Sequence, residues 1–158
     1  MGTIRIIEFQ PEYEKPVKDL IHLVLRSLGI TNKYPEINRD TDLDYILEKY
    51  KDRGRFWLAL KGKELIGTVA IEEKDNNIAK LKRMFVLPEF QGTGIGQKLF
   101  DTALNFTKNN GYKTLRLNTD KIMNRAHRFY EKNGFQKIGE DDKRLFYELD
   151  LTPNHNQE

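Results

Sequence analysis

The sequence predicts one α+β domain whose elements follow the order β-α-α-β-β-β-α-β-α-β-β. Three observations lead to this class. Short runs with alternating apolar residues, typical of strands, occur both before and after longer stretches with apolar residues at helical spacing. The 158 residues, of which 38% are hydrophobic, suffice for one core. No internal repeat or linker divides the chain, so we predict a single domain over residues 1–151.

The N-terminal half begins with a weakly alternating strand and continues with the clearest helix of the chain. Gly29 ends this helix, because glycine readily takes the left-handed conformation that terminates helices. After a polar loop, Asp42 is expected to cap a short helix that ends at Tyr50. The predicted segments are a strand over 4–9, helices over 12–28 and 42–50, and strands over 55–60 and 64–72 that form a hairpin.

The C-terminal half alternates strands and helices before it closes with a hairpin. Asp75-Asn76-Asn77 turns the chain into a strand, and Asn110-Gly111 ends the long helix that follows. The predicted segments are strands over 78–86 and 114–118, helices over 95–109 and 124–132, a hairpin over 136–140 and 144–149, and a disordered tail over 152–158.

The composition excludes several classes of function. The 27 basic and 24 acidic residues leave a charge of +3, which is too small and too scattered to indicate a nucleic-acid partner. No run of 18 apolar residues and no signal peptide is found, so we expect no membrane partner and a cytoplasmic location. The three histidines share no metal-ligand spacing, so no metal is expected. The chain has no cysteine and one serine, Ser27, which argues against a covalent acyl-enzyme.

The most informative segment runs from the strand over 78–86 into a glycine-rich turn and a helix. Its residues Gln91-Gly-Thr-Gly-Ile-Gly96 carry three glycines, which allow a ligand to approach the backbone closely. The amide groups of the turn and of the first helical turn lack partners, and together with the helix dipole they form an anion site suited to a pyrophosphate. Gln97-Lys98-Leu99 follows where a nucleotide-triphosphate loop requires lysine and a hydroxyl, and Gln97 also breaks the dinucleotide fingerprint.

This turn resembles the acetyl-CoA loop of the GNAT N-acetyltransferase superfamily, whose pattern is Gln/Arg-x-x-Gly-x-Gly/Ala. Gln91, Gly94 and Gly96 fill its fixed positions, and Val86-x-Pro88 precedes them. A second segment, Asn124-Arg-Ala-His-Arg-Phe-Tyr-Glu-Lys-Asn-Gly-Phe135, resembles the other conserved block of the superfamily, Asn-x-x-Ala-x-x-x-Tyr-x-x-x-Gly-Phe, with Asn124 assigned to its asparagine. The resemblance covers roughly residues 3 to 150. It implies the GNAT fold, a mixed central sheet of about seven strands whose two central parallel strands splay apart.

The resemblance implies an acetyltransferase that moves the acetyl group of acetyl-CoA directly to a primary amine in a ternary complex, without a metal. Tyr130 is implied as the general acid that protonates the leaving thiolate, a role for which a phenol is suited. The acceptor is expected to be a small molecule or a peptide, and the protein a monomer or a homodimer. The residues implied in acetyl-CoA binding are Met84, Phe85, Val86, Gln91, Gly92, Thr93, Gly94, Ile95, Gly96, Gln97, Asn124 and Tyr130.

The general base and the acceptor are left open by the sequence. Relatives often place a glutamate on the strand before the loop, roughly where this chain has Lys80, so Glu72, Glu73 or a water chain are the candidates for the base. Four acidic residues of the segment 34–44 predict an acidic wall suited to a cationic amine; they are Glu36, Asp40, Asp42 and Asp44. Two alternative functions are kept, namely an idle CoA-binding or sensing domain, and an acyltransferase that uses a longer acyl-CoA or an acceptor other than an amine.

Overall fold

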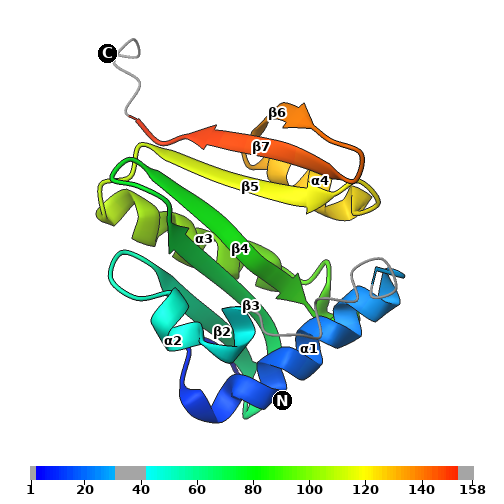
Figure 1. Cartoon of the computed structure of the whole chain (residues 1–158). Helices are drawn as coiled ribbons and strands as arrows, with labels where there is room; N and C mark the ends of the chain where they lie inside the picture. Colours follow the sequence, from blue (N-terminus) through cyan, green and yellow to red (C-terminus); the bar gives the residue numbers. More distant parts are fainter. Residues whose placement is uncertain (1–2, 31–41, 153–158) are drawn as a thin grey trace.

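The computed structural model describes residues 3–30 and 42–152, which form one seven-stranded sheet with helices on both faces (Figure 1). The strands lie in the order β1-β2-β3-β4-β5-β7-β6, and only β4 and β5 are parallel neighbours. This arrangement confirms the predicted fold class and element order. The strands are β1 (Ile4–Glu8), β2 (Arg55–Lys61), β3 (Glu64–Glu73), β4 (Ile78–Val86), β5 (Thr114–Asp120), β6 (Gln136–Glu140) and β7 (Arg144–Asp150).

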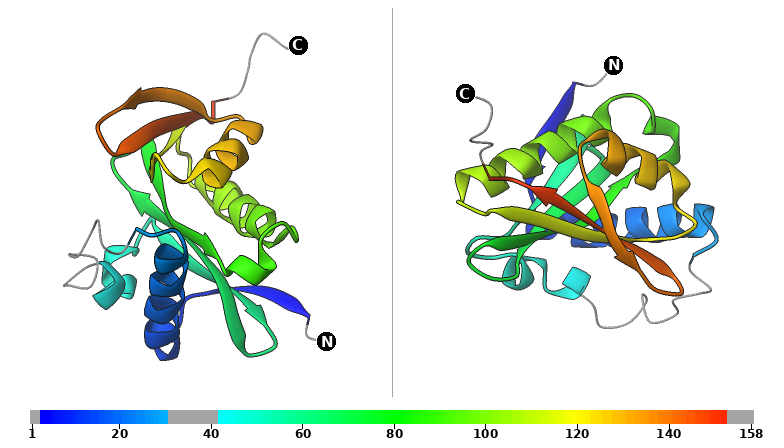
Figure 2. Two further views of the ribbon diagram at one scale, coloured as in Figure 1. Left: turned by 90° about the vertical axis from the view of Figure 1, so that its right-hand side faces the viewer. Right: turned by 90° about the horizontal axis from the view of Figure 1, so that it is seen from above.

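The helices cover opposite faces of the sheet. Helices α3 and α4 lie on one face, and α1 and α2 lie on the other face over the N-terminal strands (Figures 1 and 2). Both α1 and α3 contact β3 and β4, which places these two strands at the centre of the core. Their apolar stripes are buried against the sheet, as the helical spacing predicts. The bounds are Glu14–Ser27 for α1, Ile46–Lys49 for α2, Ile95–Asn109 for α3 and Asn124–Lys132 for α4.

The two parallel strands separate soon after they begin. Strand β4 pairs with β5 only from Ile78 to Lys80, opposite Thr114 to Arg116. Beyond Lys80 the two strands diverge, as the ribbons in Figure 1 show. A bulge in the β3–β4 pairing lies on the same stretch, where Arg83 has a positive φ of 54° and its carbonyl accepts a hydrogen bond from the Thr68 hydroxyl at 2.7 Å. On the side of β4 that faces β5, the backbone of Met84, Phe85 and Val86 therefore lies next to an opening in the sheet. On the other side, Phe85 and Val86 pair with β3.

Two local predictions differ from the structure. Asp42 does not cap a helix, because α2 begins after Tyr45 and no side chain caps it; the Asp42 carboxylate accepts hydrogen bonds from Tyr50 and Arg83 instead. The predicted helix over 12–28 begins with a 3-10 turn, Pro11–Tyr13, before α1. Of the predicted tail over 152–158, only Thr152 lies within the described residues. No helix in the described ranges is long and apolar enough to cross a membrane.

Candidate functional site

The glycine-rich turn between β4 and α3 is held by its own residues. The Gln91 side-chain amide donates to the Val86 carbonyl at 3.0 Å, which ties the turn to the end of β4. Gly92 and Gly94 have positive φ angles of 79° and 93°, which side chains rarely allow, and Gly94 is the N-cap of α3. No side chain caps this helix end, so the amide groups of its first turn are left for an external acceptor. The turn thus has the uncapped amide groups on which the predicted anion site depends.

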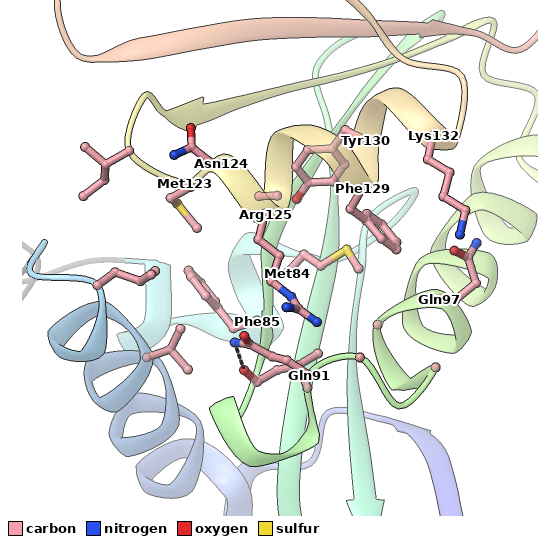
Figure 3. A pocket seen from close by; sticks show the side chains of 18 residues that line it. Met84, Phe85, Gln91, Gln97, Met123, Asn124, Arg125, Phe129, Tyr130 and Lys132 are labelled. Carbon is pink, nitrogen blue, oxygen red and sulfur yellow. Dashed lines mark hydrogen bonds between the residues drawn. The ribbon is translucent and has the colours of Figure 1, made fainter.

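A cavity of about 490 Å³ lies between this turn, the end of β4 and α4 (Figure 3). Arg125 and Lys132 line it, and no carboxylate of the described residues does, so the cavity is suited to an anionic ligand. We call it the first cavity. Ten of the twelve residues implied in acetyl-CoA binding line it: Met84, Phe85, Val86, Gln91, Gly92, Gly94, Gly96, Gln97, Asn124 and Tyr130.

The other two implied residues lie outside the lining. The side chain of Ile95 is buried in the core, so only its backbone amide can serve the anion site. Thr93 is exposed, and its hydroxyl donates to the Phe90 carbonyl at 2.5 Å, which stabilises the turn.

The sequence analysis missed two cations of α4 that line the first cavity. Arg125 reaches from α4 toward the glycine-rich turn in Figure 3, and its Nη2 atom lies 3.0 Å from the position that a Cβ on Gly92 would take. Lys132 lies near Gln97 at the other side. Both residues occupy variable positions of the second conserved block, and only their positive charge next to an anion site could have indicated them.

The register of the second block needs a correction. Counted back from Ala126 and Tyr130, the asparagine of the pattern Asn-x-x-Ala-x-x-x-Tyr falls on Met123 and not on Asn124. Met123 is the N-cap of α4, and Asn124 is the first residue of this helix. Asn124 still lines the first cavity, but the family position is filled by a thioether, which cannot donate a hydrogen bond to a ligand.

Tyr130 lies at the inner end of the first cavity. Its ring packs edge-on against Phe129 and Phe135, and 8% of the residue is exposed. Its hydroxyl points into the cavity in Figure 3 and makes no hydrogen bond with any residue of the described chain. Burial raises the pKa of Tyr130 above its ordinary value, so the phenol keeps its proton at neutral pH. This side chain can therefore donate a hydrogen bond to a ligand but cannot act as a base.

A second cavity, of about 200 Å³, opens between the diverging strands β4 and β5. It shares four lining residues with the first cavity: Met84, Phe85, Met123 and Tyr130. Leu25 of α1 and Ile30 also line it, and its other walls come from β4, β5 and the beginning of β7. These strands carry its charged residues, Lys82, Arg83, Asp120 and Arg144. Two ligands, one in each cavity, would therefore meet at Tyr130.

The carboxylates that the sequence suggested as bases lie elsewhere. Glu72 binds Lys49 at 2.7 Å and Lys82 at 3.6 Å, and Glu73 binds Arg53 at 3.1 Å. Burial alone would raise the pKa of Glu72, but the hydrogen bond from Lys49 and the neighbouring lysine charges lower it on balance. Neither glutamate lines either cavity. Asp120, at the end of β5, lines the second cavity together with Tyr130, and the sequence analysis did not select it.

The acidic wall is not observed within the described residues. The Asp42 carboxylate is bound by Arg83, with Nε at 3.1 Å from Oδ2, and by the Tyr50 hydroxyl, while Asp44 pairs with Lys18. Burial alone would raise the pKa of Asp42, but its hydrogen bonds with Arg83 and the charge of this guanidinium lower it to about 2. Both charges are thus neutralised inside the protein, while Glu36 and Asp40 lie outside the described residues.

Comparison with known proteins defines the class. A family model described as "Acetyltransferase (GNAT) domain" matches residues 52–137. The chain is 27% identical to an acetyltransferase of the GNAT family from Staphylococcus aureus, whose crystal structure superposes with a TM-score of 0.84 over 95% of this chain and 100% of the other. The chain therefore belongs to the GNAT acetyltransferase family.

Curated relatives share a part of their length with this chain. It is 34% identical over 88 residues to an N-acetylaspartate synthetase of Danio rerio, and the aligned region covers 55% of this chain and 31% of the relative. It is 36% identical over 107 residues to N-acetyltransferase 8 of Rattus norvegicus, and this aligned region covers 63% of this chain and 48% of the relative. The match thus spans less than half of the length of either relative.

Proposed function

We propose that the chain transfers an acetyl group from acetyl-CoA directly to a primary amine, with both substrates bound at once. The observation that carries this proposal is the meeting of two cavities at Tyr130, one beside an anion site and one beside a carboxylate. Membership of the GNAT family supports acetyl-CoA as the cosubstrate.

The residues of the first cavity fit acetyl-CoA. The uncapped amides of α3 suit a pyrophosphate, and the position of a Cβ on Gly94 has no atom within 4 Å, so the space beside the helix end is free. Arg125 and Lys132 add positive charge that suits the phosphates. On the side of β4 that faces β5, the stretch from Met84 to Val86 has no strand partner and offers backbone groups to the pantetheine arm, as the family resemblance implies. Bound acetyl-CoA would supply a thioester whose carbonyl carbon accepts the amine.

Two of the chain's own residues then serve as proton acceptor and proton donor. A primary amine with a pKa near 10.4 is mostly protonated at pH 7, and freeing its lone pair costs about 4–5 kcal/mol. Asp120 is the carboxylate in the second cavity, and it can take this proton directly or through a water molecule. As the nitrogen–carbon bond forms and the carbon–sulfur bond breaks, Tyr130 donates its hydrogen to the leaving sulfur. The nitrogen loses its second proton as the amide forms, and this proton restores the neutral phenol of Tyr130.

Direct transfer needs no nucleophile from the protein. The chain has no cysteine, and the hydroxyl of its one serine, Ser27, donates to the Val24 carbonyl at 2.6 Å on α1, outside both cavities.

A thiol-release assay tests the proposal. Purified protein is mixed with acetyl-CoA and a panel of primary amines, and free CoA and the acetylated amine are measured together. We expect equal amounts of both products with at least one amine of the panel. Acetyl-CoA binding without release of CoA for any amine would instead support an idle CoA-binding domain. Faster turnover with a longer acyl-CoA would show that the transferred group is not acetyl.

A further inference from the structure

Among the described residues, the second cavity is lined by more cations than carboxylates. Three cations line it, Lys82, Arg83 and Arg144, against one carboxylate, Asp120. The charge of Arg83 is used internally, because this guanidinium holds Asp42. Lys82 and Arg144 therefore determine the charge that a ligand would meet.

Neither of these two cations is held tightly. Lys82 lies 3.6 Å from Glu72, whose shorter contact of 2.7 Å is with Lys49. Arg144 reaches Asp141 at 3.4 Å on the exposed side of the turn between β6 and β7, where both side chains are about half exposed. Ion pairs of this kind contribute little, so both cations can turn to a ligand at small cost.

Lys80 adds to the positive potential from the same strand. It lies two residues before Lys82 on β4, so both side chains point to the same face of the sheet. Lys80 forms no ion pair or hydrogen bond with any part of the chain that is described. Burial lowers the pKa of Lys80, and the charges of Lys82, Lys74 and Arg144 lower it further, while Glu72 opposes this effect.

Asp120 provides the opposite charge near Tyr130. It is 9% exposed, its Oδ1 accepts the Ile122 amide at 2.9 Å, and it lies opposite Arg144 in the β5–β7 pairing. The cavity thus offers both a carboxylate that suits an ammonium and cations that suit a carboxylate. Its volume of about 200 Å³ is the space of roughly seven water molecules, which suits a molecule of amino-acid size.

We propose that the second cavity binds the acceptor as an amine that carries a carboxylate, with the acid group held by Lys82 and Arg144 and the amine directed toward Asp120 and Tyr130. This inference rests on the proposed function and specifies its substrate class. It differs from the acidic wall expected from the segment 34–44. Of the four acids in that segment, Asp42 and Asp44 are compensated by Arg83 and Lys18, while Glu36 and Asp40 lie outside the described residues.

The test compares each acceptor with a neutral analogue of the same shape. Initial rates at saturating acetyl-CoA are measured for a panel of L-amino acids, for their C-terminal amides and for the polyamine spermidine. We expect kcat/KM to be at least about tenfold higher for the acids than for their amides, since a charge-assisted hydrogen bond contributes about 1.5–3 kcal/mol. Equal or faster turnover of the amides or of spermidine would overturn the acceptor class, while acetyl transfer itself would stand.

Two variants test the residues. Lys82→Gln and Arg144→Gln should each raise KM for the preferred acid about tenfold or more and leave KM for its amide unchanged. Arg5→Gln removes the same charge from an exposed side chain of β1 and serves as the matched control. If Arg144→Gln and Arg5→Gln behave alike, Arg144 does not bind the acceptor and the proposal is wrong.

A binding experiment separates this proposal from the proposed function. Calorimetry without acetyl-CoA should detect the preferred amino acid on the wild-type protein and at least about tenfold weaker binding on Arg144→Gln. If the wild type acetylates amines but calorimetry shows equal affinity for acids and amides, the acceptor class is wrong. If the protein binds the acid through Arg144 but releases no CoA, the proposed function is wrong while the anion-binding second cavity stands.

Discussion

The two cavities that meet at Tyr130 are built in different ways. The first takes its ligand groups mainly from the backbone of one continuous segment, the end of β4 and the uncapped turn before α3. The second takes them from side chains on three separate strands, β4, β5 and β7. Backbone groups recognise what all ligands of a family share, whereas side chains can change one at a time. In the function that we propose, the fold would therefore fix the donor, while Lys82, Asp120 and Arg144 would select the acceptor.

The largest effect is expected at the turn of the first cavity. Gly94→Val introduces a side chain at a φ of 93° and fills the space beside the helix end. We expect acetyl-CoA affinity to fall at least roughly 10³-fold, because two or more charge-assisted hydrogen bonds of about 1.5–3 kcal/mol each are lost. Calorimetry measures this change. Gly111→Val is the control, since Gly111 has a φ of 78°, is equally free of neighbours and lies outside both cavities. Equal affinities for the two variants would refute the anion site.

The next effect concerns the point where the cavities meet. Tyr130→Phe keeps the packing against Phe129 and Phe135 but removes the hydrogen that Tyr130 donates. Turnover should fall by roughly 10²-fold, as is typical when proton donation is lost. The dissociation constant of acetyl-CoA should barely change, because the phenol acts mainly on the developing thiolate. Steady-state kinetics and calorimetry on the same preparation check both statements. A folded variant with wild-type turnover would remove Tyr130 from the mechanism.

A smaller effect is expected in the wall of the second cavity. The pKa of Asp42 is lowered to about 2 in the folded protein, so this carboxylate stabilises the fold above about pH 4, and the contribution is lost as the pH falls from about 4 to 2. A pKa shift of this size corresponds to about 2 kcal/mol of the free energy of unfolding. The free energies of unfolding of the wild type and of Asp42→Asn, measured with denaturant, should therefore converge by about 2 kcal/mol over this pH range. Asp44→Asn, which removes an acid from a more exposed pair, should show little convergence. Parallel curves for the wild type and Asp42→Asn would show that the pair with Arg83 contributes nothing.

The smallest effect is expected for a side chain of the first cavity. Arg125→Gln should weaken acetyl-CoA binding about tenfold, the contribution of one charge-assisted hydrogen bond. The loss should shrink at high salt, which screens exposed charges. Arg128→Gln, on the same helix but outside both cavities, is the control. If the two variants bind acetyl-CoA with the same affinity in calorimetry, Arg125 does not contact the phosphates.

The sequence predicted one cavity much better than the other, for a physical reason. Gly94, Gly96 and Gln91 lie within one short turn, and backbone geometry follows from local sequence. The ion pair that compensates Asp42 could not be predicted, because its partner Arg83 lies 41 residues away in the sequence, in a bulge of β4. Lys82 and Arg144 come together only through the strand order β4-β5-β7. The register of the second block, which puts Met123 and not Asn124 at the asparagine position, follows from the spacing in the sequence alone. The structure shows that Asp120 shares the second cavity with Tyr130, whereas Glu72 and Glu73 do not line it.

The central claim is that both cavities are filled at once and that the acetyl group passes directly between them. Initial rates measured while acetyl-CoA and the preferred amine are both varied test it most directly. We expect double-reciprocal plots that intersect, and no CoA released from acetyl-CoA in a rapid-mixing experiment without amine. Parallel plots, together with a stoichiometric burst of CoA before amine is added, would indicate an acetylated enzyme and contradict the account.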